Sequence, residues 1–92
     1  MIANPFQESL KSQIEELLAK HGLPADTKVH ERLGEFFYEI CFQPYSAWIY
    51  SDGAGLSGPD LDQRFEIYDY DSLDDLAAAY FSFAQNFIRL LP

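Results

Sequence analysis

The first apolar pattern in the chain has the spacing of an amphipathic helix. Apolar residues recur every three or four positions, at Phe6, Leu10, Ile14, Leu17 and Leu18. This spacing places them on one stripe of a helix. Asn4 is suited to cap that helix and Pro5 to form its first turn. Gly22 followed by Pro24 predicts its end, because glycine accepts the left-handed conformation and proline cannot continue the helix.

Alternating apolar and polar positions then predict strands. Residues 29–33 alternate over a short stretch, and Gly34 predicts a turn or bulge after it. Residues 35–42 alternate more clearly, and the even-numbered side is the expected core face. Gln43-Pro44 interrupts the pattern before residues 45–51 resume it. The two segments therefore predict an antiparallel hairpin.

The next segment predicts a loop followed by another strand. Residues 51–63, SDGAGLSGPDLDQ, hold three glycines, one proline and three aspartates, a composition typical of turns and loops. Residues 64–70 alternate again and predict a strand. In a regular strand, Phe65 and Ile67 would share one face. The opposite face would carry Arg64, Glu66, Tyr68 and Tyr70.

The strongest helical pattern closes the chain. Ser72 and Asp75 have the spacing of a capping box at its start. The stripe that follows comprises Leu73, Leu76, Ala77, Tyr80, Phe81, Ala84, Phe87, Ile88 and Leu91. We therefore expect one α+β domain over residues 1–92, ordered helix, three or four antiparallel strands, helix, with both helices packed on one sheet face.

Composition limits the class of protein further. The chain has 92 residues, enough for one small domain, and 48% of them are hydrophobic, too many for a disordered chain. Cys41, the one cysteine, lies in the apolar run FFYEICF, and we expect it to be a core residue in a reducing compartment. The start of the chain has no basic and apolar secretion signal, and no apolar run reaches 18 residues. These features predict a cytoplasmic protein with no membrane partner.

Net charge adds the main functional clue. It is −9, and residues 52–75 hold eight of the 15 acidic residues but one of the six bases. Such a field repels nucleic acid and attracts basic partners. Asp71, Asp74 and Asp75 have a structural explanation at the start of the last helix, where the helix dipole favours them. The remaining acids with the two tyrosines predict one acidic patch that binds a partner, comprising Asp52, Asp60, Asp62, Glu66, Tyr68, Asp69, Tyr70, Asp71 and Asp74. Whether the tyrosines lie exposed or pack under a helix is left open.

Motifs for catalysis and cofactor binding are missing. His21 and His30 adjoin no nucleophile in a known motif, and GAGLSG lacks the GK[ST] ending of a phosphate loop. The aspartates around Asp71 do not follow the calcium-loop pattern, since Leu73 already begins the helix. We therefore expect a protein that is not an enzyme and that holds no cofactor and no metal.

Residues 65–76, FEIYDYDSLDDL, lead from a strand into a Ser-capped amphipathic helix. In this run, in its size and in its acidity, the chain resembles the small immunity proteins of bacterial toxin–immunity systems, including contact-dependent inhibition. The resemblance implies that it binds a cognate toxin domain, often a basic nuclease, and covers its active or substrate surface. Acidity also allows a phage-encoded inhibitor that imitates nucleic acid, of the anti-CRISPR or anti-restriction type. A third alternative is a small non-enzymatic adaptor, with Phe37, Trp48 and the tyrosines at its interface.

Overall fold

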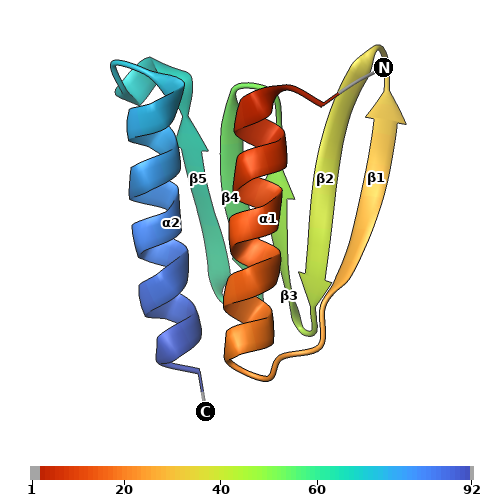
Figure 1. Ribbon diagram of the computed structural model, residues 1–92, viewed down its shortest axis with the longest axis vertical. Coiled ribbons are helices and arrows are strands. Elements are labelled where there is room, and N and C mark those ends of the chain that lie inside the picture. Colours follow the sequence, from red (N-terminus) through yellow and green to blue (C-terminus); the bar gives the residue numbers. More distant parts are fainter. Residues whose placement is uncertain (1–2, 92) are drawn as a thin grey trace.

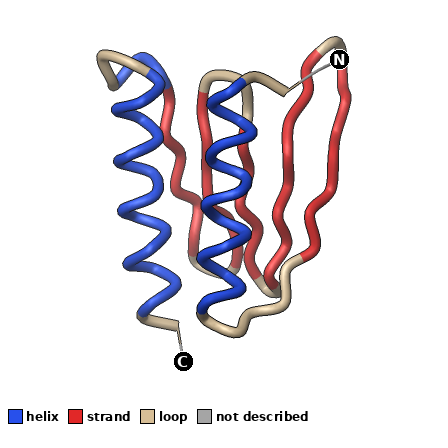
Figure 2. The backbone as a smooth tube through the Cα atoms, viewed as in Figure 1, coloured by secondary structure: helices blue, strands red, loops and turns tan. Residues whose placement is uncertain are grey.

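Two α-helices pack side by side on one face of a five-stranded antiparallel sheet in the computed structural model, which describes residues 3–91 (Figure 1). The elements are α1 (Pro5–Lys20), β1 (Asp26–Arg32), β2 (Glu35–Phe42), β3 (Tyr45–Ile49), β4 (Gly53–Gly58), β5 (Leu61–Glu66), the 3-10 turn η1 (Ile67–Asp69) and α2 (Leu73–Arg89). The strands lie in chain order, so each pairs with its neighbours in sequence (Figure 2). The α+β class and the placement of both helices on one face are confirmed; the sheet has five strands rather than three or four.

The start of α1 is fixed by a reciprocal pair of hydrogen bonds. Asn4 Oδ1 accepts from the Gln7 backbone N–H at 2.8 Å, and Gln7 Oε1 accepts from the Asn4 N–H at 3.0 Å. This capping box satisfies two backbone donors that the first turn would otherwise leave free. Gly22 has φ 69°, the left-handed conformation expected after the helix.

Gln7 also ties α1 to the sheet. Its side chain is almost fully buried, and its Nε2 donates to the Phe36 carbonyl at 2.7 Å. Strand β3 pairs with β2 from Tyr38 to Phe42 and does not reach Phe36. The glutamine amide therefore supplies a donor to this carbonyl where β3 supplies none.

The hairpin expected between β2 and β3 is present, and β1 forms a further hairpin with β2. Between β1 and β2, Leu33 and Gly34 have φ 54° and 82°, the double positive φ of a type I′ turn. Strand β2 faces the helices with its even-numbered residues, and Tyr38, Ile40 and Phe42 are buried as predicted.

The prediction of a loop over residues 51–63 is wrong, because most of it forms β4 and the start of β5. The register runs from Gly53 opposite Glu66 to Gly58 opposite Leu61. A side chain on Gly53 would place its Cβ 2.9 Å from the Phe65 carbonyl oxygen. The small residues thus allow a close approach to β5, and these tertiary contacts override the turn-like composition.

The strand predicted over residues 64–70 ends early, at Glu66. The chain then turns through η1 to rise from the sheet to the layer of helices. This turn separates the two tyrosines: Tyr68 is 88% exposed, whereas Tyr70 is half-buried and stacks on Phe65 with ring centroids 6.5 Å apart. Helix α2 begins where predicted, with Ser72 Oγ accepting from the Asp75 N–H at 3.1 Å; this is one half of the expected capping box, and the hydrogen bonds of residues 3–91 do not include the reciprocal one.

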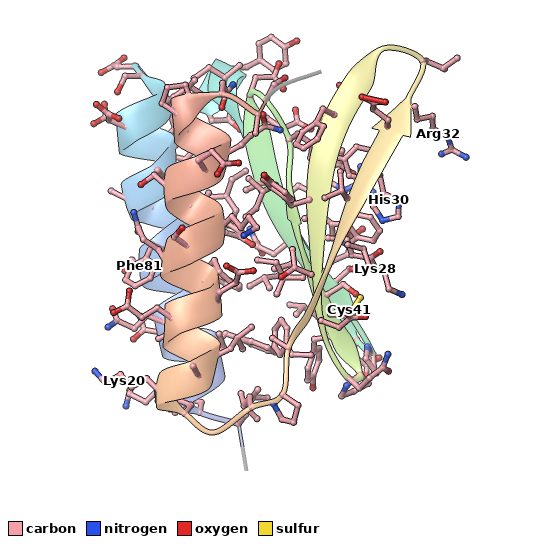
Figure 3. The ribbon with its side chains drawn as sticks, turned by 45° about the vertical axis from the view of Figure 1, so that its right-hand side comes forward. Lys20, Lys28, His30, Arg32, Cys41 and Phe81 are labelled. Carbon is pink, nitrogen blue, oxygen red and sulfur yellow. The ribbon has the colours of Figure 1, made fainter. Side chains whose placement is uncertain are left out.

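The core lies between the helices and the sheet. Helix α1 packs on β2 and β3, and α2 packs on β4 and β5. Tyr80 is fully buried there, and its hydroxyl donates to the Gly55 carbonyl at 2.9 Å. Strand β1 extends beyond the helices, which leaves Val29 59% exposed (Figure 1). Cys41 is not in the core: it is half-buried on the side of the sheet away from the helices, because it belongs to the odd-numbered set of β2 (Figure 3).

Candidate functional site

Within residues 3–91 both helices lie on one side of the sheet, and we call the other side the open face. Its side chains alternate with the core residues along every strand. By the strand registers its residues are Asp26, Lys28, His30, Arg32, Glu35, Phe37, Glu39, Cys41, Ser46, Trp48, Gly53, Gly55, Ser57, Asp62, Arg64 and Glu66. Figure 3 shows Lys28, His30, Arg32 and Cys41 pointing away from the helices. A surface large enough for a partner is therefore available on this side.

Four rings form an aromatic row across the open face. Phe37 lies in the middle, with its ring centroid 4.9 Å from His30, 5.9 Å from Trp48 and 4.8 Å from Tyr50. The Trp48 indole N–H donates to Ser57 Oγ at 2.8 Å, which fixes the orientation of the ring. These contacts hold the rings in place and leave them half-buried, so each presents part of its surface to solvent.

A polar group adjoins the row on β2 and β3. The Glu39 carboxylate contacts His30 Nε2 at 2.9 Å and accepts from Ser46 Oγ at 3.2 Å. Partial burial raises the pKa of Glu39, but hydrogen bonds from His30, Cys41 and Ser46 outweigh it and hold the pKa below its ordinary value. Burial raises the pKa of the Cys41 thiol, which disfavours the thiolate needed for nucleophilic chemistry. The group therefore orders the open face and keeps Glu39 charged.

Beside the row, the open face is hollowed into a groove of about 570 Å³ over β4. Its floor includes Gly53 and Gly55, which contribute no side chains. Trp48 and Tyr50 line it from the side of β3, and Arg64, Glu66 and Tyr68 line it from β5 and η1. The volume lies within the range of about 300–1,000 Å³ typical of ligand sites.

The predicted acidic patch does not form one unit. Six of its residues lie at the end of the molecule where the β3–β4 turn, η1 and the start of α2 come together (Figure 1). We call this set the acidic end: Asp52, Glu66, Tyr68, Asp69, Asp71 and Asp74. Asp60 lies in the β4–β5 turn, and Asp62 follows it at the start of β5. Strand β4 separates the two turns by about 20 Å.

The predicted residues also differ in exposure and in ion pairing. Tyr70 packs inward against Phe65 and offers little surface. Asp62 Oδ1 lies 3.3 Å from Arg64 Nε, in an exposed ion pair. Within residues 3–91, Asp52 and Glu66 have no ion-pair partner, so the acidic end keeps its negative charge.

The groove was not predicted, and the aromatic row was predicted only in part, as Phe37, Trp48 and the tyrosines at the interface of an adaptor. The available signal was Phe37 on the odd side of residues 35–42, with Trp48 and Tyr50 two positions apart in the next strand. The groove has no such signal, since it depends on β4 being a strand.

No three His, Cys, Asp or Glu side chains in the part of the chain that the structure describes gather in a way that could hold a metal ion. No helix within residues 3–91 combines the length and apolarity that a membrane span requires. Comparison of the chain with protein-family models, with curated proteins and with solved structures finds no match.

Proposed function

We propose that this protein is an immunity protein that binds a cognate bacterial toxin domain, a basic nuclease, and neutralises it by covering its active site or substrate surface. One observation supports this most. The aromatic row and the acidic end meet at the groove. Rings held in place, and carboxylates that have no ion-pair partner among residues 3–91, therefore form one continuous surface beside the groove.

Such a surface suits a basic protein partner. A nuclease must bind phosphates and therefore presents Lys and Arg around its active site. Carboxylates at the acidic end would steer that surface inward and accelerate association. Half-buried Trp and Tyr residues supply contact area at small entropic cost, which is what slows dissociation. An affinity of about −12 kcal/mol, that of a nanomolar complex, needs both contributions.

The proposed contact surface changes the predicted set of residues in three ways. Trp48 and Tyr50 join it from the aromatic row. Tyr70 serves the core instead of the interface. Asp60 and Asp62 contact the toxin only if it extends along β5 to the opposite end of the sheet.

Matched charge variants test the proposal. The toxin partner is first isolated from the host lysate as a basic polypeptide retained by the tagged protein at low and at moderate salt. Variant D52N/E66Q then removes two charges from the acidic end, and control E16Q/E31Q removes two exposed charges from α1 and from the helix side of β1; each changes the net charge from −9 to −7.

We expect the first variant to slow association about tenfold and to weaken protection of cells against the toxin, and the control to do neither. Equal effects of both variants would show that only total charge matters, which contradicts a defined binding surface. If the retained polypeptide has no toxicity that this protein suppresses, the immunity function is wrong.

A nucleic-acid-mimicking inhibitor is the second candidate, because one observation favours it. Acidic side chains at Asp60, Asp62, Glu66 and Asp69 follow the β5 edge from one end of the sheet to the other. Charges spread along an edge resemble a phosphate backbone more than one compact patch does. Competition with DNA for a multi-subunit nucleic-acid-processing complex would identify this function, and a single basic toxin would exclude it.

A further inference from the structure

The groove on the open face has a shape set by the backbone. A Cβ on Gly53 would lie 2.9 Å from the Phe65 carbonyl oxygen, and one on Gly55 would lie 3.0 Å from the Gln63 carbonyl oxygen. Both contacts would be with backbone oxygens and tighter than nearly all real Cβ contacts, so a side chain at either position would require the backbone to shift. The floor of the hollow is therefore formed by the backbone of β4 and not by side-chain rotamers.

Neighbouring rings fix the positions of Trp48 and Tyr50, which form the aromatic side of the groove. Phe37 contacts Trp48 and Tyr50 and stacks on His30, whose ring centroid also lies 6.0 Å from that of Trp48. Trp48 and Tyr50 line the groove and are half-buried, so part of each ring is available to a ligand, while the indole donor is already bonded to Ser57.

The opposite side of the groove is negative. The described residues that line the groove include Asp62, Glu66 and one base, Arg64, on β5, and Asp52 in the β3–β4 turn at its end. Asp62 lies in an ion pair with Arg64, which leaves Asp52 and Glu66 to meet a ligand. Anions are repelled here, and a neutral apolar group would bury these carboxylates without compensation.

We propose that this groove binds an arginine side chain presented by a basic partner protein. A guanidinium is flat, stacks on aromatic rings and forms paired hydrogen bonds with carboxylates, so it matches both sides of the groove. Lysine would meet the charge but lacks the planar stacking surface. The inference rests on the proposed function for the source of the arginine, since the toxin is the basic partner.

The groove provides its own optical reporter, because Trp48 is the one tryptophan of the chain. The probe is the capped tripeptide acetyl-Gly-Arg-Gly-amide, compared with its citrulline and lysine counterparts. Citrulline keeps the shape of arginine but removes its charge. Binding is followed by Trp48 fluorescence and by the NMR shift of its indole N–H.

We expect saturable binding of the arginine peptide, at least about tenfold tighter than that of the citrulline peptide and tighter than that of the lysine peptide. E66Q should weaken it about tenfold, as expected for a lost charge-assisted hydrogen bond, and E16Q should not. Glu16 is the matched control because it is also exposed but lies on α1, on the other side of the molecule. Both substitutions are at exposed positions, and circular dichroism verifies the fold.

Equal binding of arginine and citrulline peptides, no saturable response, or equal effects of E66Q and E16Q would each overturn the inference. The two proposals can fail separately. Peptide binding without toxin neutralisation would retain the arginine groove and reject the immunity function. If the wild-type protein and E66Q neutralise the toxin equally and neither binds the peptide, the immunity function is retained and the arginine groove is rejected.

Discussion

Replacing Gln7 by glutamate would convert one buried donor into an acceptor and leave the size of the side chain unchanged. The amide of Gln7 accepts from the Asn4 N–H and donates to the Phe36 carbonyl at 2.7 Å. A carboxylate keeps the first bond, and the helix dipole favours it at this position by about 0.3–1 kcal/mol. It cannot donate to the Phe36 carbonyl, so a carboxylate oxygen and a carbonyl oxygen would face each other at a position where Gln7 is 2% exposed.

The lost hydrogen bond to Phe36 costs more free energy than the helix dipole returns. An unsatisfied buried carbonyl costs about 1–3 kcal/mol, and a buried charge beside it costs more. We therefore expect Q7E to lower the free energy of unfolding by about 3 kcal/mol at pH 7. A chain of 92 residues has a stability of roughly 5–14 kcal/mol, so the change is a large fraction of the total.

The penalty should depend on pH with a definite sign. Burial and the facing carbonyl raise the pKa of the introduced carboxyl in the folded state above its unfolded value of about 4.3. Below that value the group is protonated in both states and can donate to Phe36, so the penalty is smallest. As pH rises toward the folded pKa, the penalty grows by about 1.4 kcal/mol per pH unit.

Urea denaturation at pH 4 and pH 7, followed by far-ultraviolet circular dichroism, measures this directly. With a slope of about 1 kcal/mol/M, Q7E should shift the midpoint by about 3 M at pH 7 and by much less at pH 4. Q7M removes the amide at both pH values and should cost about the same at each. Q13E makes the same change at an exposed position of α1 and should stay within about 0.5 kcal/mol. A Q7E penalty that is absent or independent of pH would refute the role assigned to Gln7.

Three other substitutions have expected outcomes. L33N should raise stability by about 1 kcal/mol and the melting temperature by about 4–8 °C, because asparagine tolerates the positive φ of Leu33; an unchanged melting temperature would contradict the turn geometry. E39Q should cost more stability at pH 7 than at pH 3. The pKa of Glu39 is lowered in the fold, so its contribution is present above its usual value of 4.5 and is lost as pH falls through the lower folded value; an equal cost in urea titrations at both pH values would argue against the bonds to Glu39. Y80F should cost about 1 kcal/mol in thermal or urea unfolding through loss of the bond to Gly55, and a neutral effect would mean that this carbonyl has another donor.

Elements with local signals were predictable from the sequence. Asn4, Ser72 and Gly22 act within a single turn of chain, so their residue types are enough to place the helix ends. The alternation in residues 35–42 likewise gave the core face of β2, since one side of that strand is apolar throughout.

Strand β4 could not be predicted in this way. Its sequence, GAGLSG, has the composition of a turn, and it becomes a strand through pairing with β3 and β5 and the packing of Tyr80 above it. The spread of the predicted acidic residues has the same origin, because strand β4 places Asp60 and Asp52 at opposite ends. The groove and the aromatic row depend on cross-strand neighbours, which no local pattern gives.

The open face has a consequence for how this protein could diversify. Along each strand, every second residue faces the helices and packs in the core, while the residues between them face solvent. Substitutions on the solvent side can therefore alter recognition while the core remains intact. Gly53 and Gly55 are the exceptions, since the backbone itself requires them. A lineage under pressure to recognise new partners could thus vary the walls of the groove while its floor stays constant.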